Sequence, residues 1–329
     1  MTPLPQPAAS GIDALAARVV KGEPRAIARA ITLVENRTPE AAALVSAVFP
    51  HAGRAYLVGV TGPPGAGKST LVDRLTTEIR QGGATVGIVA VDPTSPFTGG
   101  AVLGDRLRMQ DHAADDGVFI RSMATRGHLG GLSRGTSEAA LILDAAGRDV
   151  VLIETVGVGQ DEVDIVRTAD VSVVALVPGT GDDVQAIKAG IMEIADIFVV
   201  NKADREGADR LVAAIEANQS LQTFGPDDWR PPILRTVGTT GAGVADLWGS
   251  VRAFREHQAR HGGARRRRRD EFRLRELIAE RCLERVMREV LAPGEWEATV
   301  DRLAAGTLDP YTAADDLLAR AFGGGGRSA

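Results

Sequence analysis

A glycine-rich segment at residues 62–69 constrains the fold of this chain of 329 residues more than any other feature. It reads Gly-Pro-Pro-Gly-Ala-Gly-Lys-Ser, which matches the phosphate-binding loop that joins a buried strand to a helix. An apolar run at 56–60 precedes it and a helical pattern at 70–81 follows it. A glycine-rich tight turn is the structural alternative, and the complete match in this context favours phosphate binding.

The residue types of this loop indicate what it would bind. Its glycines let backbone N–H groups turn toward a polyphosphate, and the following helix offers its positive end. Lys68 reaches the β and γ phosphates, while the hydroxyl group of Ser69 is a ligand for Mg²⁺. The predicted nucleotide-binding residues here are Gly62, Pro63, Pro64, Gly65, Ala66, Gly67, Lys68, Ser69 and Thr70.

Short runs rich in Val and Ile alternate with helical patterns between residues 55 and 237. Continuous apolar strands separated by helices are typical of a mostly parallel sheet that is covered on both faces. The predicted fold class is therefore α/β, a doubly wound P-loop NTPase sheet with helical extensions at both ends. The seven predicted strands are 56–60, 86–91, 118–121, 150–153, 171–177, 197–200 and 233–237.

Helical patterns flank the predicted sheet on both sides. Apolar residues recur at helical spacing between residues 12 and 47, and Glu23-Pro24 and Thr38-Pro39 read as helix starts. Beyond a helix at 244–257, an arginine run at 265–269 reads as a solvated linker, followed by helical patterns at 271–291 and 311–322. We therefore expect a helical N-terminal extension at 1–54, a nucleotide-binding domain at 55–260, and a C-terminal helical arm with a flexible tail at 261–329.

Composition narrows the choice of partners and compartment. The formal net charge is −5 with 25% charged residues, and the arginine run lacks aromatic residues for base stacking, so neither nucleic acid nor a membrane is an expected partner. The single cysteine, Cys282, excludes an intrachain disulfide framework. No stretch approaches the roughly 20 apolar residues of a membrane span, and no secretory signal is visible. The expected location is the cytoplasm.

A second motif, Asn-Lys-Ala-Asp at 201–204, argues for guanine rather than adenine. It follows a predicted strand and so lies at the carboxyl edge of the sheet, where nucleotides bind. Asp204 can accept hydrogen bonds from the N1 and N2 groups of guanine, donors that adenine lacks; leaving such an acceptor unpaired costs about 1–3 kcal/mol. A common surface turn is the alternative for the isolated tetrapeptide. The predicted base-binding residues are Asn201, Lys202 and Asp204.

Acidic residues at strand ends predict the metal site. Mg²⁺ takes hard oxygen ligands, so Asp92, Asp105 and Glu154 join Ser69 as candidate ligands, directly or through water. Helix capping and strand-end solvation are their structural alternatives.

The sequence Glu-Thr-Val-Gly at 154–157 has the form of a loop that senses the γ-phosphate through the Gly157 amide. The predicted catalytic residues are Lys68, Glu154 and Gly157. No glutamine directly follows Gly157 to position the attacking water, so intrinsic hydrolysis should be slow. Gln160 is a possible substitute or an exposed loop residue without a chemical role.

With these motifs, the chain resembles the MeaB/ArgK family of GTPases over nearly its whole length, most distinctively at 62–70, 91–96, 104–109, 154–160 and 201–204. The resemblance implies a homodimeric GTPase chaperone that uses GTP and Mg²⁺. It also implies a partner, an adenosylcobalamin-dependent acyl-CoA mutase such as methylmalonyl-CoA mutase, which stimulates hydrolysis and which the GTPase protects. The resemblance further implies that the GTPase gates loading of the cofactor into the mutase, and no cobalamin is expected on this chain itself.

The resemblance also suggests roles for three further segments. Residues 179–188 look like a partner-sensing switch with Asp182, Gln185 and Lys188, although an exposed loop entering a helix fits equally. The C-terminal helices look like the family's dimerisation arm, although their apolar residues could also cover the chain's own domain. The second base-contacting loop departs from the family's usual Ser-Ala, so contact with guanine O6 is expected only from a backbone amide of Val237, Gly238 or Thr239.

Three other functions compete with this interpretation. A P-loop small-molecule or protein kinase of the amino-acid transport type would not need the guanine-reading Asp204. A metal-insertion GTPase would need Cys and His clusters, which one Cys and five scattered His do not provide. A scaffold with a vestigial nucleotide site is disfavoured by the intact Lys68 and Ser69.

Overall fold

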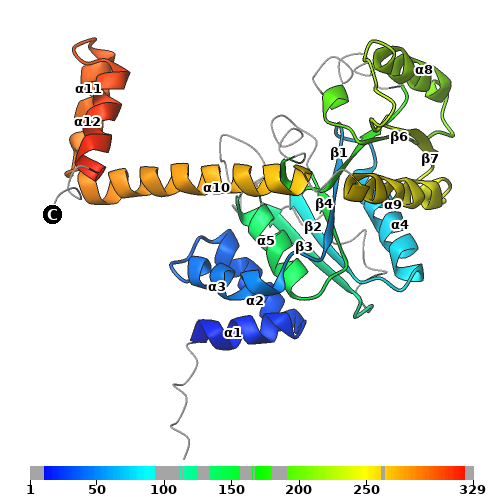
Figure 1. Cartoon of the computed structure of the whole chain (residues 1–329), viewed down its shortest axis with the longest axis horizontal. Helices are drawn as coiled ribbons and strands as arrows, with labels where there is room; N and C mark the ends of the chain where they lie inside the picture. The colour runs from blue at the N-terminus through cyan, green and yellow to red at the C-terminus, as the bar shows by residue number, and fades with distance from the viewer. Residues whose placement is uncertain are drawn as a thin grey trace, which may run out of the picture. The chain divides into compact units, whose positions relative to one another are not determined.

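The computed structural model describes residues 11–92, 112, 114–124, 134–155, 165, 167–179, 191–260 and 264–322. The chain forms two compact units, Met1–Arg265 and Arg266–Ala329. The first contains the sheet together with the helices that precede it (Figure 1). The three-part division expected from the sequence remains a proposal. Its predicted arm, which begins at residue 261, includes the last five residues of the first unit.

Seven parallel strands form one sheet, which confirms the predicted fold class (Figure 1). Their order is β3-β2-β4-β1-β5-β6-β7. Each lies within three residues of its predicted range, because continuous apolar runs are what a sheet covered on both faces requires. The strands are β1 Tyr56–Thr61, β2 Val86–Asp92, β3 Val118–Ala124, β4 Val150–Glu154, β5 Val171–Leu176, β6 Ile197–Asn201 and β7 Ile233–Thr236.

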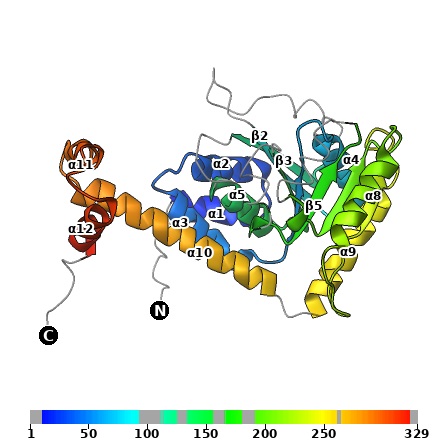
Figure 2. The ribbon, with the colours of Figure 1, turned by 90° about the horizontal axis from the view of Figure 1, so that it is seen from above.

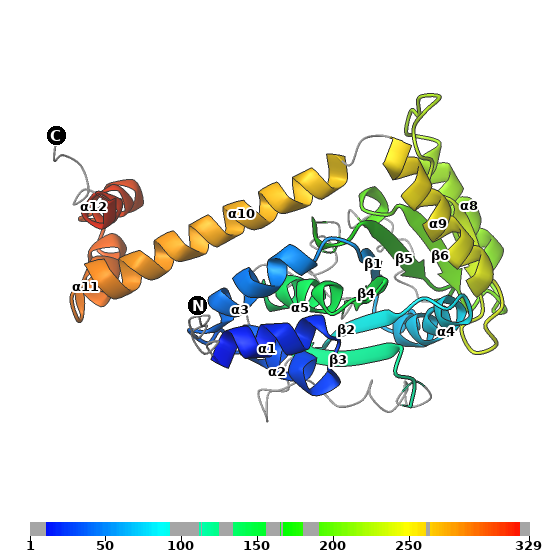
Figure 3. The same cartoon turned by 60° about the horizontal axis from the view of Figure 1, so that its bottom comes forward.

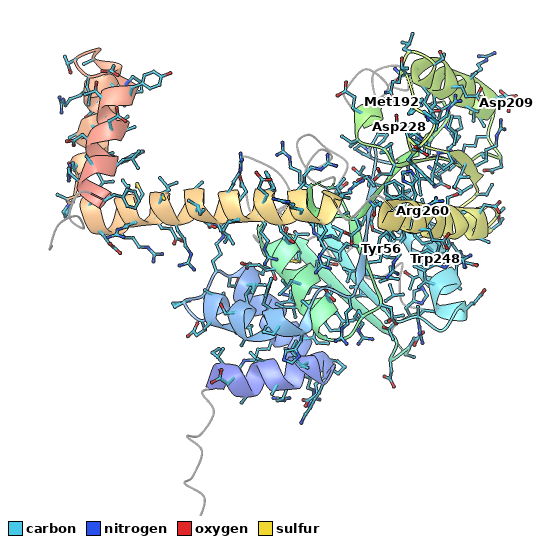
Figure 4. All side chains as sticks on the ribbon, viewed as in Figure 1. Tyr56, Met192, Asp209, Asp228, Trp248 and Arg260 are labelled. Atoms are coloured by element: carbon cyan, nitrogen blue, oxygen red, sulfur yellow. The ribbon has the colours of Figure 1, made fainter. Side chains whose placement is uncertain are left out.

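Helices cover both faces of the sheet (Figure 3). On one face, α4 (Lys68–Gln81) and α9 (Val244–Arg260) pack on alternate residues of the central strands, and Trp248 of α9 packs against this core (Figure 4). On the other face, α5 (Arg134–Ala145) and α8 (Ala208–Gln219) cover the intervening residues. This alternation follows from the two-residue period of a strand.

The N-terminal helices pack against α5 and extend the core of the first unit (Figure 2). They are α1 (Gly11–Val20), α2 (Pro24–Glu35) and α3 (Ala41–Val48), followed by a short 3₁₀ turn at Phe49–His51. The carboxylate of Asp144 on α5 then accepts hydrogen bonds from the backbone amides of Gly53, Arg54 and Ala55. These bonds hold the segment that leads into β1, so the N-terminal helices and the first strand are tied to the same helix.

The arginine run is helical, so the prediction of a linker at 265–269 was wrong: these residues form the first turns of α10 (Ala264–Arg285). Cations at a helix N-terminus oppose the helix dipole, but arginine is a good helix former. Arg265 also has a carboxylate partner, because its Nη1 lies 2.7 and 2.6 Å from the two carboxylate oxygens of Asp196. Burial raises the pKa of Asp196, and the guanidinium of Arg265 opposes that effect.

The second unit consists of the rest of α10, a π-helical turn at Val286–Val290, α11 (Glu295–Ala304) and α12 (Pro310–Phe322). Helix α11 was not predicted. It lies beside α12 (Figures 1 and 3), and Arg320 of α12 contacts Glu295 and donates to the carbonyl oxygen of Val290 at 2.7 Å. A small apolar cluster around Val286 and Leu317 completes the packing of this unit. Within the described ranges, no helix is both long and apolar enough to cross a membrane.

Candidate nucleotide-binding site

The predicted phosphate-binding loop connects β1 to α4. Lys68 begins α4, and its buried side chain reaches back over the loop, where Nζ donates to the carbonyl oxygens of Gly62 at 2.8 Å and Pro63 at 3.2 Å. The ammonium group is thus held over the loop at the positive end of α4. An anion bound there would meet both charges, which is the arrangement that phosphate groups require.

Two glycines of the loop leave little room for a side chain. Gly62 has a φ of 136°, and an added Cβ would lie 2.0 Å from the carbonyl oxygen of Ala175 on β5. Gly67 has a φ of 79°, and its added Cβ would lie 2.6 Å from Nδ2 of Asn201. Positive φ values and close approach together explain why glycine stands at both positions.

The order of the strands brings Glu154 to the phosphate-binding loop. Since β4 lies between β1 and β2, Glu154 is in register with Val60 of β1 and Ala90 of β2 at the centre of the sheet. The hydroxyl group of Ser69 donates to Oε1 of Glu154 at 2.6 Å, and both side chains are buried. A hydroxyl and a carboxylate side by side are the hard oxygen ligands that Mg²⁺ takes, so these two residues fit that ion.

Asn201 links this loop to the motif predicted to read guanine. At the end of β6, its buried side chain donates from Nδ2 to the carbonyl oxygen of Ala66 at 2.8 Å. Its Oδ1 accepts from the hydroxyl group of Thr236 at 3.0 Å and from the amide of Gly238 at 3.1 Å. One side chain therefore joins the phosphate-binding loop to both predicted base-reading segments.

Lys202 makes a second connection between the two motifs. Its φ of 55° is in the left-handed region, which few residues other than glycine adopt, and its Nζ donates to the carbonyl oxygen of Gly65 at 2.9 Å. Asp204 follows two residues later with an exposed side chain. The motif therefore stands at the rim of the phosphate-binding loop with its carboxylate accessible to a ligand.

The second predicted base-reading loop follows β7 and uses most of its amides within the protein. The Val237 amide donates to Ala242, the Gly238 amide donates to Asn201, and the Thr240 and Gly241 amides both donate to the carbonyl oxygen of Val237. Within the part of the chain that the structure describes, the Thr239 amide is the one amide of residues 237–241 with no protein acceptor. Of the three predicted O6 donors, Thr239 is the one whose N–H remains available.

Several predicted site residues lie outside the residues that the structure describes. Asp92 ends β2, but its side chain is outside the described residues. Six further predicted residues lie wholly outside the described residues: Asp105, Gly157, Gln160, Asp182, Gln185 and Lys188. The described part of the site thus contains the phosphate-binding loop, the Ser69–Glu154 pair and both base-reading segments.

Arg74 of α4 contacts the second base-reading loop and was not among the predicted site residues. Its guanidinium donates from Nε to the carbonyl oxygen of Gly238 at 3.3 Å and from Nη2 to that of Thr239 at 3.4 Å. The sequence signal for this role is weak, because an arginine six residues after Lys68 on a helix resembles any surface arginine. Only the packing of the second base-reading loop on α4 distinguishes it.

Comparison with known proteins finds relatives that match most of this chain. The family model described as Methylmalonyl Co-A mutase-associated GTPase MeaB matches residues 27–290. A protein of Pyrococcus abyssi that is named a GTPase is 51% identical, across 95% of this chain and 98% of that protein. The mouse protein named methylmalonic aciduria type A homolog, mitochondrial, is 34% identical, across 94% of this chain and 79% of that protein.

A solved structure points the same way. The crystal structure of a LAO/AO transport system kinase is 28% identical in sequence, with a TM-score of 0.71, and the match covers 95% of this chain and 98% of that one. The fold is therefore shared over nearly the whole chain with a solved protein.

Proposed function

Because the chain belongs to the MeaB family of P-loop GTPases and hydrolyses GTP, we propose that it is the chaperone of an adenosylcobalamin-dependent acyl-CoA mutase. The proposed partner is methylmalonyl-CoA mutase, for which the description of the family and the name of the mouse relative are the support. The proposed role is to gate loading of the cofactor into the mutase and to protect the mutase from inactivation. Cobalamin would be bound by the mutase and not by this chain.

The observation that carries the nucleotide chemistry is the hydrogen-bonded connection between residues of both motifs through Asn201 and Ala66. We assign Lys68 to the β and γ phosphates and Ser69 with Glu154 to Mg²⁺, with Asp92 and Asp105 as further candidate ligands. Mg²⁺ would neutralise charge that develops on the phosphate oxygens. The Gly157 amide would sense the γ-phosphate, and Asp204 with the Thr239 amide would read guanine.

Slow hydrolysis by the isolated chain follows from this assignment. Phosphoryl transfer depends mainly on positioning and on stabilisation of charge, and no glutamine follows Gly157 to orient the attacking water. A partner that orders the loops around the γ-phosphate would therefore accelerate the reaction. Asp182, Gln185 and Lys188 are the proposed contacts through which the mutase acts.

A homodimer built through the second unit is part of the proposal. Of the large apolar side chains that are exposed in the described residues, nine of eleven belong to the second unit. Apolar residues gathered on one unit support a protein interface, since single scattered ones would need no partner. They are Leu274, Ile278, Leu283, Met287, Trp296, Val300, Tyr311, Leu318 and Phe322.

The dimer is tested with Leu274→Glu and Ile278→Glu, which place charges on α10 at side chains that are 58% and 53% exposed. We expect a shift from dimer to monomer in sedimentation velocity, with the melting temperature of the first unit unchanged. Leu221→Glu is the matched control, because this side chain is 83% exposed on the first unit. An unaltered dimer in both α10 variants would contradict the assignment of this surface.

The chaperone role is tested by measuring hydrolysis of GTP and of ATP with and without purified methylmalonyl-CoA mutase. We expect hydrolysis selective for GTP and stimulation by the mutase. Absence of stimulation, with tight GTP binding retained, would reject this mutase as partner and leave the GTPase. A preference for ATP, with transfer of phosphate to an alcohol or a protein, would instead favour a kinase of the amino-acid transport type.

The expected cytoplasmic location stays with the proposal. The single cysteine supports a reducing compartment. Cell fractionation with an antibody against the chain would test this part.

A further inference from the structure

Helix α4 carries phosphate-binding residues at its start and supports the second base-reading loop one turn further on. Thr70 and Arg74 are four residues apart and so lie on one face of the helix. A Cβ added to Gly238 would lie 3.3 Å from Cγ2 of Thr70, and one added to Gly241 would lie 3.9 Å from Cδ of Arg74. Together with the two hydrogen bonds from Arg74, these contacts place the loop directly against this face.

The bond from Arg74 to Gly238 fixes the orientation of one peptide group. A trans peptide is planar, and its C=O and N–H groups point in opposite directions. All described peptide bonds are trans. When Nε of Arg74 holds the carbonyl oxygen of Gly238 toward α4, the N–H of Thr239 in the same peptide must point away from the helix. This N–H is the loop amide that has no protein acceptor among the described residues.

We propose that Arg74 is a specificity-determining positioning residue, which orients the Gly238–Thr239 peptide so that the Thr239 amide donates to O6 of guanine. This inference rests on the proposed nucleotide site. An N–H fixed in this direction can donate a hydrogen bond to O6 of guanine. Adenine presents an amino group at the same position, so the N–H would face another donor there. Val237 and Gly238 of the loop have no polar side chain that could hold this peptide group in place. Arg74 supplies that support from α4.

The second bond, from Nη2 of Arg74 to the carbonyl oxygen of Thr239, holds the next peptide group as well. A planar guanidinium with several donors can hold two neighbouring carbonyl oxygens at once. Lysine has one ammonium group on a flexible stem and would hold the same pair less firmly. Two variants therefore separate the contribution of the donors from that of the charge.

The experiment compares Arg74→Met, Arg74→Lys and the unchanged protein by isothermal titration with GDP, IDP and ADP. IDP retains O6 but lacks the 2-amino group that Asp204 would read. For Arg74→Met, loss of the oriented donor should weaken GDP and IDP by the same factor, about tenfold, with ADP affinity unchanged. Arg74→Lys should restore part of the loss. The exposed Arg210 of α8 provides the control, and Arg210→Met should bind all three like the unchanged protein.

Two outcomes would overturn the inference. Equal weakening of GDP, IDP and ADP in Arg74→Met would assign Arg74 to general support of the fold, and unchanged GDP affinity would remove it from the site. A different result, in which the unchanged protein itself fails to prefer GDP over ADP, would overturn the proposed base-reading site and not only the role of Arg74. Melting temperatures of all variants confirm that the compared proteins are folded.

Discussion

The side chain of Asn201 donates a hydrogen bond to the carbonyl oxygen of Ala66 at 2.8 Å, across 135 residues of sequence. The same side chain accepts from Thr236 and from the amide of Gly238. The loop predicted to hold the phosphates and the loops predicted to hold the base are therefore parts of one hydrogen-bonded network. Displacement of one of them must disturb the others, because the buried amide group has no alternative partner in water.

Replacement of Asn201 by Ala should thus affect stability and nucleotide affinity together. It removes three hydrogen bonds and leaves buried polar groups unpaired, at a cost of about 1–3 kcal/mol in the free energy of unfolding. Urea denaturation and titration with GDP measure the two effects. Asn218→Ala, on the partly exposed surface of α8, should change neither by a comparable amount. Full GDP affinity in Asn201→Ala would show that the two loops are held independently.

Gly67→Ala tests the close approach between the phosphate-binding loop and Asn201. The added Cβ would lie 2.6 Å from Nδ2 of Asn201, so the side chain of Asn201 or the loop must move and nucleotide binding should be lost. Gly83→Ala is a matched control, because Gly83 has a similar φ of 82° but nothing within 4 Å of the added Cβ. Backbone strain should cost the control about 1–2 kcal/mol of stability, and the control should bind GDP normally. Equal behaviour of the two variants would refute the role of crowding.

Lys68→Met should leave a folded protein without useful GTP hydrolysis. The substitution keeps an apolar stem in the buried site but removes the positive charge from the phosphates, and loss of one such stabilising group lowers kcat by about 100-fold or more. Steady-state release of phosphate from GTP measures the rate, and circular dichroism checks the fold. A variant with more than a tenth of the original rate would exclude Lys68 from the reaction.

Asp204→Asn should reduce the preference for guanine without loss of the phosphate site. The carboxylate is exposed at the end of the motif, so its replacement leaves the core intact. The amide of Asn has one acceptor oxygen where the carboxylate has two, so it accepts a hydrogen bond from only one of the two guanine donors. GTP affinity should therefore fall by about 1–3 kcal/mol, with ATP affinity little changed. Competition binding with GTP, ITP and ATP provides the measurement. Unchanged selectivity would mean that another group reads the base.

Acid should remove the contribution of Asp115 to stability. The guanidinium of Arg80, at 2.8 Å, holds the pKa of this carboxyl below its ordinary value. Since the folded pKa is the lower one, the stabilisation is complete above the unfolded pKa of about 3.9 and disappears as pH falls through the folded value. The pair is partly exposed, so Asp115→Asn should cost at most about 1 kcal/mol at pH 7. Urea denaturation at pH 7 and pH 3 should show a smaller difference at the lower pH.

Local signals in the sequence determined most of the fold. Apolar runs placed all seven strands, since a strand buried on both faces shows no polar alternation, and Gly62 and Gly67 marked a loop whose backbone only glycine adopts. The same signals predicted the residues of the phosphate-binding loop and Asn201. Each of these features depends on a residue and its near neighbours along the chain, so the sequence alone is enough to predict it.

Relationships between distant residues were decided by the tertiary structure alone. The position of β4 between β1 and β2 puts Glu154 against Ser69, and packing of the loop at 237–241 on α4 puts Arg74 under Gly238. The ion pair between Arg265 and Asp196 likewise accompanies a helix where the sequence suggested a linker. In each case the two residues are at least 69 positions apart in the sequence, and the packing of strands and helices brings them into contact. No local sequence pattern predicts such a contact.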